Sequence, residues 1–328
     1  MSLLRIALWG PLLIAALLAG AYAYMHNPFA RDGTELVQVP LSEDDPSLDR
    51  VGDLKYLGGL DIPHIGQNIG GLSGLRWDAE SGRLLAITDD ARWVWLTLDE
   101  QGERLTSVAD VESGPLLGLK GETLTGKEQG DSESLARKGD GPWIVGFERD
   151  HRIWVYDQGL AEVPTRHPLK PTEVLGELED NRGLEAMAAG SEGQLACAER
   201  IARPDRANCV LYNDDDDTFS DFPVTPPQEL TELGATPTDA DALSDGTFLI
   251  LFRSYSPAAG NTAAIVAYAP DGSSREIATF LPPLTLDNFE GLAVREEDNR
   301  TFIYIVSDDN FSGSQRTLLM KFELDPMG

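Results

Sequence analysis

Short apolar runs, each broken by Gly, Asp, Asn or Pro, follow one another from residue 51 to the end of the chain. Runs such as Arg83–Thr88 and Thr247–Phe252 are six residues long and rich in branched and aromatic side chains, as is typical of β-strands. No segment in this part has the apolar period of a long amphipathic helix. The pattern therefore predicts an all-β domain over residues 51–328.

One short pattern recurs five times in this domain: an acidic residue or Ser, a small residue, then Leu or Met. The copies are Ser73-Gly74-Leu75, Glu133-Ser134-Leu135, Glu185-Ala186-Met187, Asp241-Ala242-Leu243 and Glu290-Gly291-Leu292, and their starts lie 60, 52, 56 and 49 residues apart. A strand-rich repeat of this length predicts a β-propeller, with each copy beginning the inner strand of a blade. We expect five blades, with Val111–Gly130 as a loop; a sixth blade within that segment is the alternative.

The fifth copy ends the chain after three predicted strands, the last of them Thr317–Leu324, so its blade lacks an outer strand. The segment Asp53–Asp61 precedes the first copy and has strand-like content. A strand from the other terminus would close the ring and remove both unpaired sheet edges. We therefore expect an N-terminal strand to complete the last blade.

The N-terminal segment, residues 1–30, differs from the rest. Arg5 precedes the apolar stretch Ile6–Leu18, and Ala21-Tyr22-Ala23 resembles a cleavage site, which predicts a secretory signal peptide. The alternative is an uncleaved anchor, since the apolar stretch extends to Tyr24. Residues 31–50 are polar and are expected to form a linker. Either reading predicts a periplasmic or secreted domain, tethered to the inner membrane if the segment is retained.

The net charge of −29 and the isoelectric point near 4.3 narrow the range of partners. Such a surface repels nucleic acid, and it repels anionic substrates unless a cation or an arginine cluster reverses the local field. We expect a monomer that acts on a small anionic or ester substrate.

The two cysteines, Cys197 and Cys209, flank a plausible hairpin loop. In an exported protein they are expected to form a disulfide, and two free thiols are the alternative.

Four of the five repeats begin with a carboxylate, and the propeller geometry would bring these groups to one mouth of the central channel. Facing carboxylates must bind cations or hold protons. Oxygen ligands favour a hard ion such as Ca²⁺. The predicted metal ligands are Glu133, Glu185, Asp241, Glu290 and Asp89. The alternative is that these groups cap turns at the strand starts.

The second strand of each blade should end at the same mouth as the first begins. Arg149, Arg200 and Arg253 stand at this place in three successive blades, and guanidinium groups suit phosphate and carboxylate. Structural pairing of each Arg with a neighbouring acid is the alternative. The predicted catalytic residues are Glu290, Asp308, Arg149, Arg200 and Arg253.

Five segments of the chain resemble the bacterial phytase-like domain family, also described as "esterase-like activity of phytase". They are Gly-Gly-Leu-Ser-Gly-Leu at 70–75, Asp-Ser-Glu-Ser-Leu at 131–135, Asn-Arg-Gly-Leu-Glu-Ala at 181–186, Asn-Phe-Glu-Gly-Leu at 288–292 and Ser-Asp-Asp-Asn at 307–310. The resemblance spans about residues 54 to 325. It implies a β-propeller that hydrolyses phosphoesters or esters at its mouth.

A serine-nucleophile esterase is not expected. The segment Gly71–Leu75 departs from G-x-S-x-G because Leu occupies the last position, and the chain has only four His. The favoured function is an exported, metal-assisted phosphoesterase or esterase. The alternative is a non-catalytic propeller of the cell envelope that binds a ligand or a protein, because a fold does not decide function.

Overall fold

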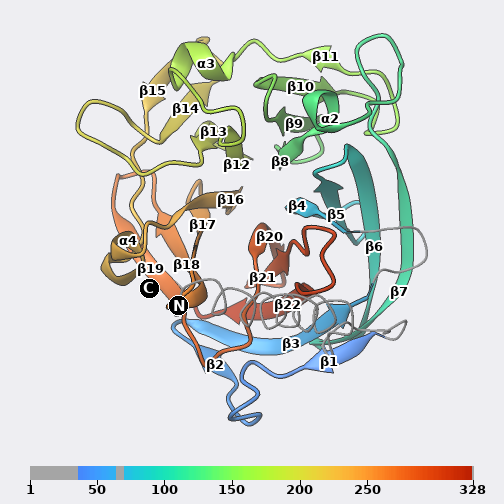
Figure 1. Cartoon of the computed structure of the whole chain (residues 1–328), viewed down its shortest axis with the longest axis vertical. Coiled ribbons are helices and arrows are strands. Elements are labelled where there is room, and N and C mark those ends of the chain that lie inside the picture. Colours follow the sequence, from blue (N-terminus) through green and yellow to red (C-terminus); the bar gives the residue numbers. More distant parts are fainter. Residues whose placement is uncertain (1–35, 64–69, 327–328) are drawn as a thin grey trace, which may run out of the picture.

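Five antiparallel sheets surround a central axis in the computed structural model, which describes residues 36–63 and 70–326 (Figure 1). The arrangement is a five-bladed β-propeller and confirms the predicted fold class. The predicted signal peptide or anchor, residues 1–30, lies outside the described residues. None of the helices in the described part has the length and apolar character needed to cross a membrane.

Four blades each consist of four consecutive strands. Blade 1 contains β4 (Leu72–Asp78), β5 (Arg83–Thr88), β6 (Arg92–Gln101) and β7 (Arg104–Pro115). Blade 2 contains β8 (Ser132–Arg137), β9 (Trp143–Phe147), β10 (Arg152–Tyr156) and β11 (Thr165–Arg166). Blade 3 contains β12 (Leu184–Gly190), β13 (Gly193–Ala198), β14 (Cys209–Asn213) and β15 (Thr218–Asp221). Blade 4 contains β16 (Thr236–Ala242), β17 (Phe248–Ser256), β18 (Gly260–Tyr268) and β19 (Ser274–Phe280).

Blade 5 combines the two ends of the described chain. It contains β20 (Phe289–Glu297), β21 (Arg300–Ser307), β22 (Thr317–Leu324), β3 (Leu54–Ile62), β1 (Val37–Val39) and β2 (Arg50–Val51). Strand β3 pairs antiparallel with β22, with Leu60 opposite Leu319, so the predicted closing strand is confirmed. Residues 36–50 were expected to be a linker, but β1 extends this sheet and Leu41 is fully buried.

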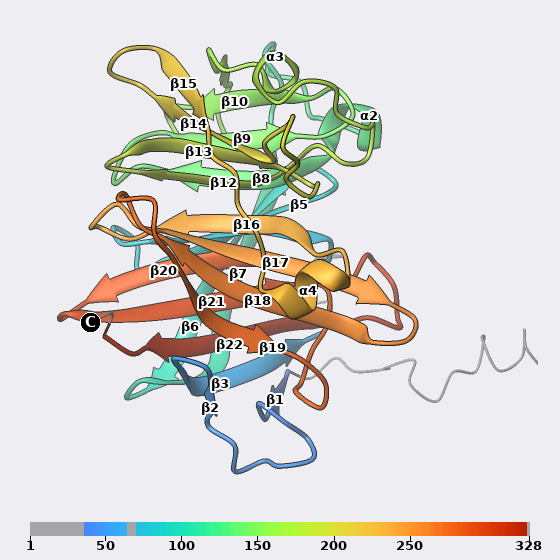
Figure 2. The same ribbon diagram turned by 90° about the vertical axis from the view of Figure 1, so that its left-hand side faces the viewer.

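The segment Val111–Gly130 does not form a sixth blade. Strand β7 continues to Pro115, and the rest is a loop that ends in the short helix α2 (Lys127–Gly130). Two more short helices, α3 (Pro171–Val174) and α4 (Gln228–Glu232), precede blades 3 and 4. Figure 2 shows α2 and α4 at the same end of the molecule, where each outer strand connects to the next inner strand. We call this end the mouth of the channel.

The hydrophobic runs of the sequence become strands that are buried on both faces. In β17, Leu249 and Leu251 pack into the core shared with blade 5, whereas Phe248, Ile250 and Phe252 pack into the core shared with blade 3. A strand between two neighbouring blades has no solvent face, which explains why its sequence is continuously apolar rather than alternating.

The inner strands β4, β8, β12, β16 and β20 each carry a β-bulge close to the mouth. A bulge redirects the side chain beside it and bends the strand. The repeat of this irregularity in all five blades fixes which residues are equivalent. The residues left out of the pairing are Glu133, Glu185, Thr238 and Glu290 in four blades, and Gly74, next to Ser73, in β4.

The predicted disulfide is present. Cys197 and Cys209 lie opposite each other on β13 and β14, and their sulfur atoms are bonded. Both are fully buried, and the bond closes the base of the loop formed by residues 199–208.

Candidate functional site at the channel mouth

Carboxylates from every blade except the fourth gather at the mouth. Glu133, Glu185 and Glu290 lie on the bulges of inner strands. In the same four blades, the residue directly after the second strand is also an acid. It lies at the mouth because the second strand ends at the rim where its antiparallel neighbour, the inner strand, begins. These residues are Asp89, Glu148, Glu199 and Asp308, and the amide of each donates to a carbonyl just before its inner strand.

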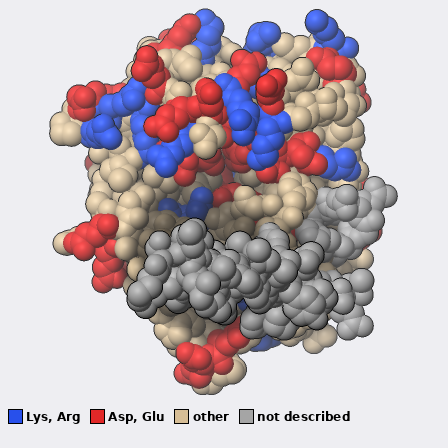
Figure 3. Space-filling view, viewed as in Figure 1, with Lys and Arg blue, Asp and Glu red and all other residues tan. Residues whose placement is uncertain are grey.

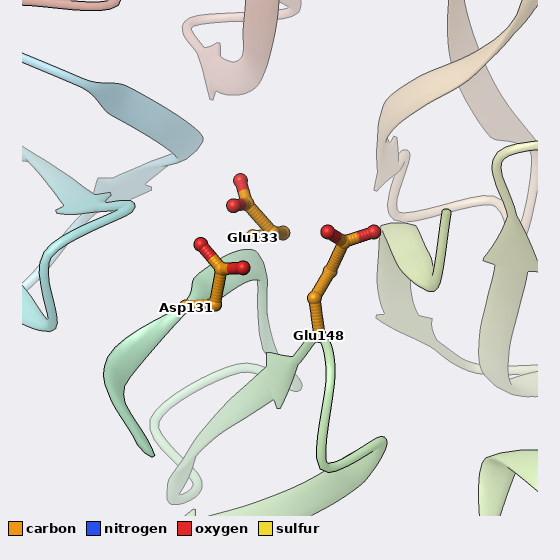
Figure 4. Close-up of side chains that lie close together, drawn as sticks. All are labelled: Asp131, Glu133 and Glu148. Atoms are coloured by element: carbon orange, nitrogen blue, oxygen red, sulfur yellow. The ribbon is translucent and has the colours of Figure 1, made fainter. Parts of the chain in front are cut away.

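Three carboxylates of blade 2 and of the residue just before it lie close enough together to share one ion. Single carboxylate oxygens of Asp131, Glu133 and Glu148 all lie within 4.8 Å of one another (Figure 4). Asp131 and Glu148 are buried, with exposed fractions of 1% and 5%. We call these three residues the mouth triad. Of the three, only Glu133 was among the predicted ligands; Asp131 and Glu148 were not, although Asp131 stands two residues before Glu133 in the sequence.

Local hydrogen bonds hold the mouth triad in place. The hydroxyl of Ser73 donates to Glu133 Oε2 over 2.8 Å, and the amide of Gly183 donates to Glu148 Oε1. Arg149 Nε donates to Asp131 Oδ2 over 2.6 Å. Blades 1, 2 and 3 therefore all contribute to positioning the triad.

Burial and mutual repulsion disfavour the charged forms of the mouth carboxyls. Burial, followed by the charges of Glu290 and Glu148, raises the pKa of Glu133 well above its ordinary value. Burial and the neighbouring Glu133 raise the pKa of Glu185 in the same way. Burial, followed by the charge of Glu290, raises the pKa of Asp308 to about 8. A cation bound among Asp131, Glu133 and Glu148 would offset the repulsion that acts on Glu133.

Among the described residues, four cations pair with acids of this mouth, and one of them, Arg182, lies 3.8 Å from Glu199 through its Nε. Lys127 Nζ lies 2.8 Å from Asp89 Oδ2 and 3.4 Å from Asp131 Oδ1. Arg149 pairs with Asp131, and Arg253 Nη2 lies 3.1 Å from Glu290 Oε1. Two of the three predicted arginines thus lie at the mouth, each paired with an acid.

The third predicted arginine, Arg200, points elsewhere. Its guanidinium donates to the carbonyls of Leu175 and Ala207, each over 2.6 Å, and it forms no ion pair within the described part of the chain. It lines a separate cavity between blades 3 and 4, together with Arg253. The three arginines therefore do not form one ring, because the loop after β13 carries Arg200 away from the channel.

The fourth repeat was placed three residues too far along the chain. Its bulge lies between Pro237 and Asp239, so Thr238, not Asp241, occupies the position of the mouth carboxylates. Asp241 lies deeper in the channel, where it accepts hydrogen bonds from the amides of Ala242 and Val294, each 2.8 Å long. The structure therefore separates Asp241 from the predicted set of metal ligands.

Deeper in the channel, Arg76 forms an ion pair that the sequence did not reveal. Its Nη1 lies 3.1 Å from Asp239 Oδ2, and its Nε lies 3.7 Å from Asp241 Oδ1. The side chains of Arg76 and Asp239 are 3% and 0% exposed. Burial, opposed by the charge of Arg76, raises the pKa of Asp239 to about 6.

The chemistry of the mouth fits a hard divalent cation. The triad offers oxygen atoms only, which is the ligand type that Ca²⁺ prefers. Asp89 Oδ1 is buried and accepts no hydrogen bond from any described residue, whereas Asp131 Oδ1 has Lys127 Nζ 3.4 Å away. A buried carboxylate oxygen without a partner is costly, so it favours a cation beside it.

Several solved structures are similar to this chain at low sequence identity. A thermostable family-43 glycoside hydrolase has a TM-score of 0.47 and 9% identity, covering 79% of this chain and 94% of its own. A gluconolactonase from Xanthomonas campestris has a TM-score of 0.43 and 12% identity, covering 87% and 97%. A luciferin-regenerating enzyme has a TM-score of 0.42 and 11% identity, covering 79% and 95%. A search of curated proteins finds no match.

The sequence itself gives the family. Residues 67–311 match the sequence profile of the family described as phytase-like, esterase-like activity of phytase. This match covers about three quarters of the chain and includes all five inner strands. The chain therefore belongs to the phytase-like family.

Proposed function

We propose that this protein is a hydrolase that cleaves phosphoesters, or carboxylic esters, of small anionic molecules at the channel mouth with the help of a divalent cation. The observation that carries this proposal is the buried mouth triad, in which each carboxylate places one oxygen within 4.8 Å of the other two. Membership of the phytase-like family supports ester cleavage as the reaction class.

The mouth triad would hold the cation, and Ca²⁺ is the first candidate because all the ligand atoms are oxygens. When bound, such an ion supplies polarisation of the ester and neutralises the charge that develops on its oxygens. Arg253 has a buried Nε without a hydrogen-bond partner among the described residues. It can therefore donate to an anionic group that enters the mouth.

Two further carboxyls are suited to proton transfer. The Asp308 carboxyl, with its pKa raised to about 8, holds a proton at neutral pH and can give it to the departing alcohol oxygen. In the proposed step, water attacks phosphorus or the carbonyl carbon, and the new bond to oxygen replaces the bond to the alcohol. The proton released by water passes to an ionised carboxylate, for which we nominate Glu290.

An activity assay on the purified full-length chain tests this proposal. 4-Nitrophenyl phosphate and 4-nitrophenyl acetate are supplied with Ca²⁺ or with a chelator. We expect cation-dependent release of nitrophenol that falls at least about tenfold in Glu133→Gln, since the variant loses a charged ligand. The matched control is Glu192→Gln, whose exposed side chain lies between β12 and β13 at the opposite end of the channel.

The control should retain the wild-type rate. Turnover that is equal in Ca²⁺ and in chelator would contradict cation assistance. No turnover with either ester, combined with cation binding, would favour a binding propeller instead.

We also propose that the protein is a monomer that works outside the cytoplasm. The disulfide between Cys197 and Cys209 supports an oxidising compartment. The predicted signal peptide or anchor at residues 1–30 would deliver the domain to the periplasm or secrete it, with a membrane tether if the segment is retained.

A further inference from the structure

A cavity of about 500 Å³ opens between blades 3 and 4, beside the mouth. Five arginines line it: Arg182, Arg200, Arg203, Arg206 and Arg253. We call it the arginine pocket. Figure 3 shows the corresponding face of the molecule, where Lys and Arg side chains mix with Asp and Glu over its upper part. Such a concentration of arginine is unexpected in a chain of net charge −29.

The loop between β13 and β14 builds one wall of the pocket. Within it, the amide of each of Arg203 and Arg206 donates to the carbonyl of the other, over 2.9 and 3.1 Å, which makes a tight turn. The disulfide at the base of the loop fixes where the turn lies. Both arginines are thereby held on the same side of blade 3.

Three of the five arginines lack an acidic partner. Arg182 Nε lies 3.9 Å from Glu179 and 3.8 Å from Glu199, and Arg253 pairs with Glu290. In the described part of the chain, the other three form no ion pair, although Glu177, Glu179 and Glu199 also line the pocket. These three are Arg200, Arg203 and Arg206.

Arg200 lies where its charge is poorly compensated. Its Nη1 is buried and has no hydrogen-bond partner among the described residues. Burial, followed by the charges of Arg206 and Arg203, lowers the pKa of Arg200 to about 10. A guanidinium that is desolvated and repelled by its neighbours gains most from an incoming anion.

We infer that the arginine pocket binds a phosphate group of the substrate that is not itself hydrolysed. Arg253 joins the two sites, because it lines the pocket and pairs with Glu290 of the mouth. A molecule with one ester phosphate at the mouth and a second phosphate in the pocket would contact both. The preferred substrates are then small molecules with at least two phosphates. This inference rests on the proposed function for the mouth, but binding in the pocket is testable alone.

Calorimetric titration with inorganic phosphate and with pyrophosphate, in the presence of a chelator, tests the pocket directly. The full-length wild type is compared with Arg203→Ala/Arg206→Ala. The matched control, Arg104→Ala/Arg166→Ala, removes two exposed arginines of outer strands that form no ion pair within the described residues. We expect the pocket variant to bind at least about tenfold more weakly, because charge-assisted hydrogen bonds are lost, and the control to match the wild type.

Equal affinity for phosphate in the wild type and the pocket variant would overturn the inference. So would equal weakening in the control, which would show a general effect of charge. A parallel variant, Arg203→Lys/Arg206→Lys, keeps the charges but not the forked donors, and should bind with intermediate affinity. This lysine variant still tests the pocket if the alanine variant does not fold.

Steady-state kinetics then separate this inference from the proposed function. For a bisphosphorylated ester, the pocket variant should show a KM raised about tenfold with little change in kcat, whereas 4-nitrophenyl phosphate should be hydrolysed as by the wild type. Phosphate binding without any turnover would support the pocket and contradict the hydrolase. Turnover with an unchanged KM for the bisphosphorylated ester would support the hydrolase and contradict the pocket.

Discussion

The two levels of the central channel use the same residue types in opposite ways. At the mouth, the carboxylates of several blades face one another and outnumber the nearby cations. Deeper in the channel, one arginine serves two carboxylates that are also bonded to backbone amides. The deeper carboxylates face Arg76 and accept backbone amides, whereas at the mouth Asp89 Oδ1 accepts no hydrogen bond from a described residue and neighbouring carboxylates raise the pKa of Glu133 and Glu185.

The deeper ion pair shows what a purely structural charge cluster looks like here. Arg76 donates to Asp239 and to the carbonyls of Leu75, Met187, Ala240 and Leu292. Its partner Asp239 accepts the amides of Leu75 and Leu292 as well. Arg76 thereby links four inner strands across the axis. Burial of charge alone is therefore no sign of function in this fold; repulsion between neighbouring carboxylates distinguishes the mouth.

The largest expected effect comes from breaking the deeper cluster. Arg76→Met leaves Asp239 and Asp241 buried without a cation, which should lower the free energy of unfolding by about 3–5 kcal/mol. Urea denaturation of the full chain measures this. Adding Asp239→Asn and Asp241→Asn to the same variant should recover part of the loss. A loss below about 1 kcal/mol for Arg76→Met would contradict the structural role, since that is the range of ordinary surface changes.

The pH dependence of stability should come from the mouth. Carboxyls titrate near pH 4 in the unfolded chain, whereas the pKa of Asp308 in the folded chain is raised to about 8. Between these values the folded chain binds more protons, so its stability falls as pH rises. In a chelator, the melting temperature should drop by several degrees from pH 5 to pH 8.

Two variants test whether the mouth causes this change of melting temperature with pH. Glu133→Gln/Asp308→Asn should flatten this dependence on pH, because both side chains then stay neutral at every pH in the range. The control Glu192→Gln should keep the wild-type slope, since this exposed residue lies far from the mouth along β12. Equal slopes in all three proteins would mean that overall charge repulsion, not the mouth, sets the dependence.

The smallest expected effect is the change in the free energy of unfolding caused by Glu133→Gln, and the sign of this change is what matters. In chelator at pH 8, Glu133→Gln removes a group whose charged form is disfavoured by burial and by the charges of Glu290 and Glu148, and it should raise the free energy of unfolding by roughly 1 kcal/mol or less. Chemical denaturation with closely spaced urea concentrations can resolve this change. With Ca²⁺ present the order should reverse, because the wild type alone retains the full ligand set. If Glu133→Gln is less stable than the wild type in chelator, Glu133 stabilises the fold, as Arg76 and Asp239 do deeper in the channel.

Sequence reasoning predicted the ring because the repeat records local requirements. Each inner strand needs a short apolar run after its bulge, and this is visible at Glu133-Ser134-Leu135 and at Glu290-Gly291-Leu292. The closing strand could also be predicted. The last blade lacked an outer strand, and Asp53–Asp61 is a strand-like segment that precedes the first blade. The mouth positions of Glu133, Glu185 and Glu290 followed from the same register.

The errors arose where the decisive contacts are distant in sequence. In blade 4 the repeat carries Thr238-Asp239-Ala240, which lacks the expected pattern because Asp239 serves Arg76, 163 residues away. The placement of Arg200 depends on a loop anchored to the carbonyl of Leu175 in another segment. Neither pairing leaves a periodic signal, so a single sequence does not reveal it.

Calcium titration of the full-length chain shows whether the mouth triad binds a cation. Isothermal titration at pH 7.5 compares the wild type with Asp131→Asn/Glu148→Gln, and with Glu192→Gln as the control. We predict a saturable calcium site in the wild type and in the control. The double variant should lack this site, because it removes two of the three charged ligands of the triad. Absence of binding in the wild type, or equal binding in all three proteins, would contradict this prediction.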